Sequence, residues 1–176
     1  MPKDCIALIG FMATGKTTVG KALTEYLGKP YQFVETDQLI IEMAGKSIPE
    51  IFSGEGEKKF REYEIVACKK ASNFRKTVIS CGGGIVLNEI NIDNLKKNSF
   101  IVLLKATPAE IYRRAIDDGK ETRPVIDKED PKAEIYKVLK FRNQLYETAA
   151  EIIIETTGRK IDEIVSEIAR KTQLKT

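Results

Sequence analysis

The sequence predicts a three-layer, doubly wound α/β fold, in which helices cover both faces of a parallel sheet. Short apolar, β-branched runs alternate along the chain with longer stretches of helical pattern, as expected when strands and helices follow one another. The runs are nearly continuously apolar, which is typical of parallel strands buried on both faces. The chain has 176 residues, 42% of them hydrophobic and 31% charged, which fits one domain with a substantial core.

Each expected element has a local signal. The strands are the apolar runs at residues 5–9, 31–36, 77–81, 100–104 and 151–154. The helices are the stretches with helical spacing of apolar residues at 16–27, 38–44, 47–73, 89–97, 108–117, 131–149 and 160–171. Ser47 and Glu50 form a capping box before the longest stretch, and Gly54 and Gly56 are expected to divide that stretch into two helices. In such folds ligands bind at the carboxyl ends of the strands.

The composition excludes several classes of chemistry. The chain has no histidine, which excludes imidazole metal ligands and any Ser–His or Cys–His catalytic unit. Its three cysteines are an odd number without Cys-x-x-Cys spacing, which argues against disulfides and zinc and suits a reducing cytoplasm. The net charge of +3 is too small to indicate nucleic acid, and we see neither a membrane span nor a targeting segment. Carboxylates, lysines and arginines must therefore carry the chemistry.

The most informative motif is a phosphate-binding loop at residues 10–17. It reads Gly-Phe-Met-Ala-Thr-Gly-Lys-Thr and lies between the first expected strand and helix, the context that the G-x-x-x-x-G-K-[ST] motif requires. Glycines let successive N–H groups point at phosphate oxygens, and the helix N-terminus adds its positive end. Lys16 is expected to reach the β- and γ-phosphates, and the Thr17 hydroxyl to bind Mg²⁺. A glycine turn with an exposed lysine is the alternative.

Two acids stand at the end of the second expected strand. Side chains alternate along a strand, so Glu35 and Asp37 are expected to point the same way, at the edge where the ligand binds. Phosphoryl transfer to an alcohol needs one acid that accepts the hydroxyl proton and another that holds Mg²⁺, usually through water. The alternative for Asp37 is a structural role as N-cap of the following helix. The residues alone leave these two interpretations open.

Two further clusters narrow the reaction. Arg61 and Glu64 share a helix face, either as a functional pair or as an exposed ion pair. Gly82, Gly83 and Gly84 follow the third expected strand. Consecutive glycines are costly in chain entropy, so they indicate a close backbone approach to a ligand rather than a plain flexible turn.

A charged stretch at residues 117–130 lacks apolar periodicity and contains both Gly and Pro. We expect it to be a mobile lid, because connections longer than about 12 residues in compact domains tend to be functional or disordered. A solvated surface loop is the alternative.

Taken together, these motifs resemble those of the shikimate kinases, small P-loop enzymes that phosphorylate the 3-hydroxyl of shikimate in aromatic amino-acid biosynthesis. The resemblance spans nearly the whole chain, through 10–18, 33–37, 51–52, 56–57, Phe60-Arg61, Glu64, 82–84, Arg123-Pro124, Arg142 and Leu145-Tyr146. It implies one domain, 1–176, with a five-stranded parallel sheet in the order 2-3-1-4-5. It also implies a substrate-binding helical region at about 37–64 and a lid at about 117–130. We expect a cytoplasmic monomer that uses ATP and Mg²⁺ and has no nucleic-acid or membrane partner.

The resemblance assigns acceptor roles to residues of this chain. Asp37 would hydrogen-bond the shikimate hydroxyls and act as, or stand near, the base for the attacking oxygen. Arg61 and Arg142 would hold the substrate carboxylate, because a guanidinium matches it with two parallel hydrogen bonds. Glu64 would orient Arg61. The other acceptor contacts, backbone N–H groups or ring faces, would come from Gly82, Gly83, Gly84, Phe52 and Phe60.

The resemblance also assigns the donor side. Lys16 and Arg123 would stabilise charge on the transferred phosphoryl group, and Arg114 is the candidate to stack on adenine. Thr17, and Glu35 through water, would hold Mg²⁺. The ATP contacts of the phosphate loop would come from Ala13, Thr14, Gly15, Lys16, Thr17 and Thr18.

Two positions depart from the family pattern. Glu35 stands where the family usually has aspartate, so the water-mediated metal contact would persist with altered geometry. Ala13 stands where glycine is usual. Alanine requires a negative φ there, or else a strain of about 1–2 kcal/mol.

Other functions remain as alternatives. One is a different small-metabolite P-loop kinase, such as a gluconate kinase or a nucleoside monophosphate kinase. Arg61, Arg142 and the glycine run favour a hydroxylated carboxylic acid over a nucleotide. The other is a non-catalytic nucleotide-binding regulator, which would be expected to lose Lys16, Asp37 or Arg123; all three are present.

Overall fold

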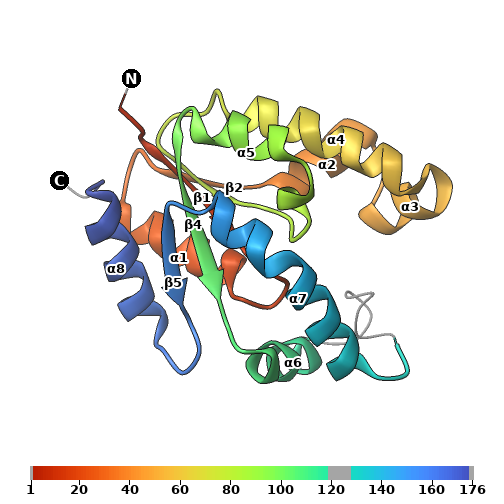
Figure 1. Cartoon of the computed structure of the whole chain (residues 1–176). Helices are drawn as coiled ribbons and strands as arrows, with labels where there is room; N and C mark the ends of the chain where they lie inside the picture. The colour runs from red at the N-terminus through yellow and green to blue at the C-terminus, as the bar shows by residue number, and fades with distance from the viewer. Residues whose placement is uncertain (1, 119–127, 175–176) are drawn as a thin grey trace.

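The computed structural model describes residues 2–118 and 128–174, and it confirms the predicted α/β fold (Figure 1). Five parallel strands form one sheet in the order β2-β3-β1-β4-β5, which is the order that the resemblance implies. The strands are β1 (Cys5–Ile9), β2 (Gln32–Glu35), β3 (Thr77–Ser80), β4 (Ser99–Lys105) and β5 (Ile152–Glu155).

The helices lie where the apolar spacing predicts them. They are α1 (Lys16–Leu27), α2 (Thr36–Ala44), α3 (Ile48–Gly54), α4 (Gly56–Ala71), α5 (Glu89–Lys96), α6 (Pro108–Asp117), α7 (Pro131–Ala149) and α8 (Ile161–Thr172), with a short 3-10 turn, η1 (Ile85–Leu87). The predicted capping box forms, because Ser47 N–H donates to Glu50 Oε2 over 2.7 Å and Glu50 N–H donates back to Ser47 Oγ. α3 ends at Gly54 and α4 begins at Gly56, so these glycines divide the long stretch as predicted. None of the helices in the described part of the chain is long and apolar enough to cross a membrane.

Helices bury both faces of the sheet. All five residues of β1 are buried. Ile6 and Leu8 face one side, where they pack with apolar residues of α1 and α8. Ala7 and Ile9 face the other side, where they pack with apolar residues of α2, α4, α5 and α7. This two-sided burial is the reason that the strands read as unbroken apolar runs.

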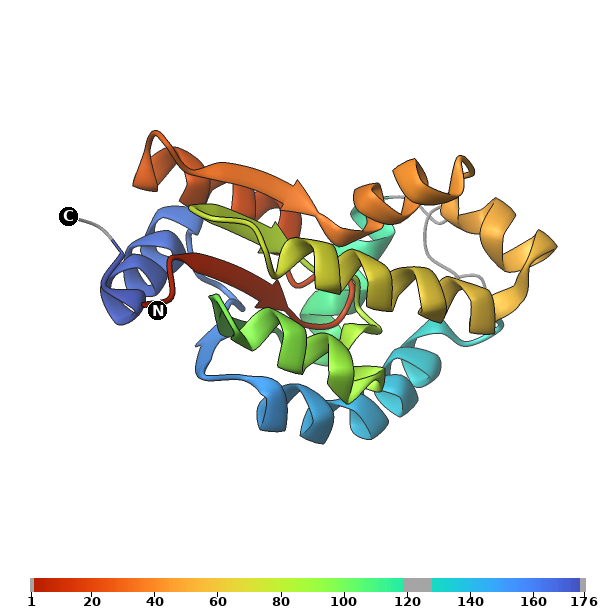
Figure 2. The same ribbon diagram turned by 90° about the horizontal axis from the view of Figure 1, so that it is seen from above.

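All strands point in the same direction, so their carboxyl ends meet at one edge. In Figure 2 the arrowheads of β1, β2 and β3 point away from the two chain termini and toward the side from which α2 and α3 project. The phosphate loop follows β1, and the glycine run follows β3, at this same edge. The motifs identified in the sequence therefore gather at one end of the sheet.

One boundary differs from the prediction with consequences for the site. β2 ends at Glu35, and Thr36 already begins α2. Asp37 lies in the first turn of that helix, so alternation along a single strand does not explain its position. The N-cap of α2 is Glu35. The interpretation of Asp37 as an N-cap is therefore wrong.

Candidate active site

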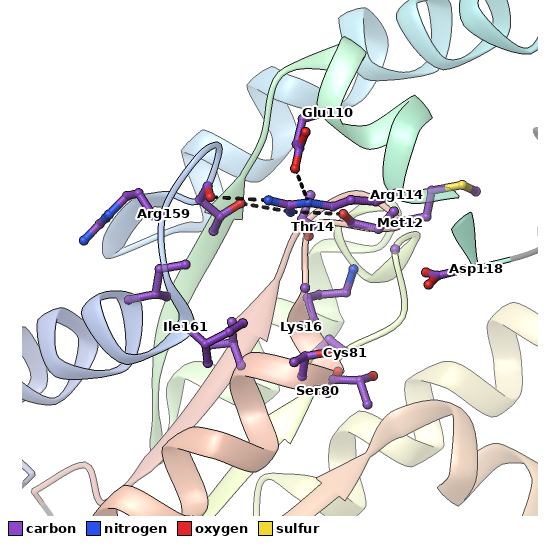
Figure 3. Close-up of a pocket in the computed structure, with 18 of the residues that line it drawn as sticks. Met12, Thr14, Lys16, Ser80, Cys81, Glu110, Arg114, Asp118, Arg159 and Ile161 are labelled. Carbon is purple, nitrogen blue, oxygen red and sulfur yellow. Dashed lines mark hydrogen bonds and ion pairs between the residues drawn. The ribbon is translucent and has the colours of Figure 1, made fainter. Parts of the chain in front are cut away.

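A cavity of about 750 Å³ lies at the carboxyl ends of the strands. Its walls come from the phosphate loop, the β2–α2 junction, the glycine run after β3, α6 and the loop between β5 and α8. Figure 3 shows Lys16, Ser80 and Cys81 on one side of this pocket and Arg114 with Glu110 on the other. Its volume suits a ligand of nucleotide size.

The phosphate loop is shaped by backbone conformations that favour glycine. Gly10 and Gly15 have φ of 147° and 95°. Gly15 is the N-cap of α1 and has no side chain to cap it, so the first-turn N–H groups of α1 can bind an anion. Lys16 Nζ donates to the carbonyl oxygens of Gly10 and Phe11, each over 2.8 Å. The ammonium group is thus held beside the loop, in the position from which it can reach a phosphate.

Ala13 has a positive φ, which is the strained one of the two conformations considered from the sequence. Its φ is 57°, in the left-handed region, which costs an alanine about 1–2 kcal/mol. Its carbonyl accepts a hydrogen bond from Arg114 Nη1 over 3.3 Å. This contact ties the phosphate loop to α6 on the opposite wall of the pocket.

Glu35 at the end of β2 and Asp37 in the first turn of α2 both line the pocket, and their surroundings differ. Thr17 Oγ1 donates to Glu35 Oε1 over 2.6 Å, so the hydroxyl of the phosphate loop and this carboxylate form one cluster of oxygen atoms. Such oxygens suit a hard divalent cation. No group of three or more His, Cys, Asp or Glu residues able to hold a metal occurs in the described residues. The Thr17 hydroxyl and the Glu35 carboxylate fit a divalent cation such as Mg²⁺, whose other ligands would be phosphates and water.

Asp37 faces the pocket and is crowded by its walls. Burial raises the pKa of the Asp37 carboxyl above the usual value of 3.8. Lys16 opposes the rise, Glu35 adds to it, and Arg61 opposes it. A carboxylate with a raised pKa next to the phosphate loop has the character of a general base.

The glycine run makes room for four charged side chains. A Cβ atom at Gly82 would lie 2.9 Å from Asp37 Oδ1 and 3.6 Å from Glu64 Oε2. One at Gly83 would lie 3.9 Å from Arg142 Nη1, and one at Gly84 would lie 2.7 Å from Arg61 Nη2. These four side chains come from three different helices, α2, α4 and α7. Close side-chain packing therefore explains Gly82 and Gly84, whereas a Cβ atom at Gly83 would make only ordinary contacts.

Arg61 is half-buried and forms an ion pair with Glu64, which is buried. Arg61 Nη1 lies 3.1 Å from Glu64 Oε1, and the Glu64 side chain is only 1% exposed. The interpretation as an exposed ion pair is therefore wrong. Burial raises the pKa of Glu64 even though Arg61 is beside it. A carboxylate kept in this desolvated position is costly for folding, which is typical of a site built to bind a polar ligand.

Two aromatic rings stand beside this pair. The ring centroids of Phe52 and Phe60 are 4.6 Å apart. Phe60 is buried, whereas Phe52 is 40% exposed. The Arg61 guanidinium lies 5.2 Å from the Phe60 ring centroid. The rings supply an apolar surface next to the charged cluster.

The opposite wall is held by Arg114. Its Nε donates to Glu110 Oε1 over 2.9 Å, and its guanidinium also donates to the side chain and carbonyl of Thr156. Hydrogen bonds from Arg113 and Arg114 lower the pKa of Glu110 to about 2, so it stays ionised. Hydrogen bonds to groups of the protein thus fix the direction of Arg114.

Sequence reasoning missed part of this wall. Glu110, Thr156, Gly158 and Arg159 all line the pocket. Thr156, Gly158 and Arg159 lie in the loop after β5, at the same edge of the sheet as the phosphate loop. Their position directly after the fifth expected strand is the signal that could have identified them. The expected lid at 117–130 lies for the most part, and Arg123 lies entirely, outside the described residues.

Comparisons with known proteins agree on one family. A family model described as shikimate kinase matches residues 12–173. The chain is 44% identical over 165 residues to a shikimate kinase of Caldanaerobacter subterraneus subsp. tengcongensis, covering 94% of both proteins. It is 38% identical over 168 residues to one of Enterococcus faecalis, covering 96% of this chain and 98% of the relative. A solved structure, shikimate kinase from Acinetobacter baumannii in complex with shikimate, superposes with a TM-score of 0.88 at 32% identity, covering 97% of this chain and 93% of the other.

The fold and the phosphate loop beside an acidic acceptor site define an ATP-dependent P-loop kinase. The family model and the relatives match nearly the whole length of the chain, which identifies one family within this class. The chain belongs to the shikimate kinase family.

Proposed function

We propose that this chain transfers the γ-phosphoryl group of ATP to the 3-hydroxyl of shikimate. Separate residues of the site accept the proton, bind the acceptor and bind the nucleotide. The observation that carries the proposal is the meeting of Asp37, Arg61, Glu64 and Arg142 at the glycine run, beside the phosphate loop. An acceptor with one carboxylate and several hydroxyls matches two guanidinium groups and two carboxylates. A nucleoside monophosphate would not need this pattern.

Asp37 is the base in this proposal. Its carboxylate accepts the proton of the 3-hydroxyl as the new oxygen–phosphorus bond forms and the bond to ADP breaks. Lys16 and the N–H groups at the start of α1 neutralise charge that develops on the phosphoryl oxygens. The raised pKa of Asp37 makes it a stronger base than an exposed aspartate.

Arg61 and Arg142 hold the acceptor's carboxylate. Glu64 keeps Arg61 in place through the ion pair between them. The rings of Phe52 and Phe60 cover the apolar face of the acceptor's carbocycle. The region at about 37–64 would then be the substrate-binding part of the single domain.

The donor nucleotide would occupy the cavity of about 750 Å³, whose described lining includes Asp37 but not Arg61, Glu64 or Arg142. Thr17, and Glu35 through water, would hold Mg²⁺, which neutralises phosphate charge and orients the γ-phosphoryl group. Ala13, Thr14, Gly15 and Thr18 would contact the phosphates through the loop and the start of α1. Arg114 would lie against adenine, near Thr156 and Arg159. A role for Arg123 in charge stabilisation remains part of the proposal on sequence grounds alone.

We also propose that the protein acts in the cytoplasm as a monomer. The buried free cysteines suit a reducing compartment. Among the described residues, one chain supplies both the phosphate loop and the wall opposite it, which supports a monomer.

The test is an assay of ADP release with ATP and Mg²⁺ present. Release is expected with shikimate and not with gluconate or a nucleoside monophosphate at the same concentration. No release across a wide range of shikimate would refute the proposal. Faster release with either control would move the assignment to that substrate class.

A further inference from the structure

Tyr146 occupies an unusual position for a buried residue. It lies on α7, and the side chain is only 1% exposed. Its ring packs in the core on the face of the sheet that carries α4 and α5. Its hydroxyl donates a hydrogen bond to the carbonyl oxygen of Gly83, in the middle of the glycine run. A core tyrosine thus reaches the backbone of the acceptor site.

Arg142 lies one helical turn earlier on α7, and its guanidinium is close enough to this hydroxyl to lower the pKa of Tyr146 against the rise that burial causes. A guanidinium can only donate, so the tyrosine oxygen is the atom that would accept from it. Burial raises the pKa of Tyr146, which keeps the hydroxyl protonated and able to donate to Gly83. One hydroxyl therefore faces both the Arg142 guanidinium and the Gly83 carbonyl.

This arrangement constrains the geometry of the acceptor site in two ways. A peptide unit is planar and trans, so holding the Gly83 carbonyl also directs the Gly84 N–H to the opposite side. The Arg61 guanidinium lies directly against Gly84. Arg142 is held at the other side of the turn, 3.9 Å from the position of a Cβ on Gly83. The Tyr146 hydroxyl thus lies at the centre of the geometry that relates the glycine run to Arg61 and Arg142.

We propose that Tyr146 is a positioning residue of the acceptor site, whose hydroxyl sets Arg142 and the Gly83 peptide in the orientation that binds the acceptor's carboxylate. The inference rests on the proposed function, because it takes Arg142 to be a carboxylate ligand. The ring of Tyr146 fills the core, and the hydroxyl serves the site. These two roles are separable, since phenylalanine keeps the ring and removes the hydroxyl that donates to Gly83 and faces Arg142.

The test compares Tyr146→Phe with Tyr136→Phe. Tyr136 lies on the same helix and is 62% exposed, so the same change there serves as a matched control. Tyr146→Phe is expected to raise KM for shikimate about ten-fold, with kcat changed less than about three-fold and KM for ATP unchanged. Kinetic constants of Tyr146→Phe equal to those of Tyr136→Phe would overturn the inference, as would an equal rise in both KM values.

A second measurement separates positioning from a general loss of stability. Dissociation constants are measured for shikimate and for its uncharged methyl ester. Because the hydroxyl acts through Arg142 on the carboxylate, the preference for shikimate over the ester is expected to fall about five-fold in Tyr146→Phe. A merely structural role would leave that ratio as it is in the unmodified protein, and this result would overturn the inference.

A double-variant cycle completes the test. In an Arg142→Ala background, adding Tyr146→Phe is expected to change shikimate affinity less than about two-fold, because the positioned group is already gone. Additive effects would contradict a role through Arg142. The proposed function fails separately, if the unmodified protein shows no shikimate-dependent ADP release.

Discussion

At the scale of single residues, the phosphate loop contains a residue that local preference does not favour. Ala13 has φ of 57°, and its carbonyl is engaged by Arg114. A left-handed conformation is uncommon for alanine, because its Cβ approaches the neighbouring carbonyl. The surrounding loop and the contact with α6 therefore hold Ala13 in a conformation that it would not adopt by itself.

Ala13→Gly is expected to stabilise the protein. Glycine relieves the strain at φ 57° but adds some entropy to the unfolded chain, so the net gain in unfolding free energy is about 0.5–1 kcal/mol. Urea-induced unfolding measures it. Ala109→Gly in α6, an exposed helical position, is the control and should lower stability by a similar amount. A loss of stability in Ala13→Gly would show that the conformation is not strained.

The sequence identified the charged residues of the site one by one, but it did not reveal which of them are buried. Glu64 is recognisable as a partner of Arg61 from helical spacing alone. Its burial is not, because the residues that cover it belong to α2, α7 and the glycine run. The choice between an exposed ion pair and a functional pair therefore needed the tertiary structure.

At the scale of elements, most boundaries follow from local signals. The capping box of α3 and the division at Gly54 and Gly56 were predictable because side chains within one turn determine them. The end of β2 was not predictable from local signals. A β-branched residue such as Thr36 suits a strand, but here it starts α2 and accepts a hydrogen bond from Gly82 N–H over 3.0 Å. A contact from another part of the chain decided that boundary.

The packing of α1 on β2 depends on a glycine in the helix. A Cβ atom at Gly20 would lie 2.5 Å from Phe33 Cε2 and 3.4 Å from Leu8 Cδ1. Gly20→Ala should therefore lower the unfolding free energy by about 1 kcal/mol or more, since crowding outweighs the gain in helix propensity. Thermal unfolding of the variant and of the unmodified protein measures this difference in unfolding free energy.

A second glycine provides the matched control. Gly54 closes α3, has no positive φ, and has nothing within 4 Å of a Cβ position. Gly54→Ala should raise the unfolding free energy by about 0.5 kcal/mol. Gly20→Ala behaving like Gly54→Ala would mean that Phe33 moves aside at little cost.

At the scale of the whole molecule, the site is a product of chain topology. The phosphate loop, the β2–α2 junction, the glycine run and the β5–α8 loop are far apart in sequence. They meet because all five strands are parallel and end at one edge. The electrostatic properties of each group then depend on residues from several elements at once.

The pH dependence of the reaction follows from this convergence. Asp37 works as a base only when ionised, and its pKa lies above the usual 3.8. As pH falls through this raised pKa, Asp37 takes up a proton, so kcat/KM for shikimate is expected to fall at a pH above 3.8. Glu35 contributes to the rise, so Glu35→Gln should move this acidic limb to lower pH. A pH–rate profile of both proteins checks the direction, and a limb moved upward would contradict it.

Asp37→Asn tests the base itself. The change keeps the shape of the side chain and removes its ability to accept the proton, so kcat should fall about a hundred-fold or more. ATP binding, measured by calorimetry, should be unchanged. Turnover within a few-fold of the unmodified protein would remove Asp37 from the proposed mechanism.

The sequence by itself determined the elements, the phosphate loop and the family. These features depend on residues near one another in the chain, where spacing and residue type act directly on the backbone. Tertiary structure alone decided the left-handed backbone of Ala13, the burial of Glu64, the link from Tyr146 to Gly83 and the part played by the loop after β5. Each depends on contacts between distant segments, and those contacts exist only after the strands have taken their order in the sheet.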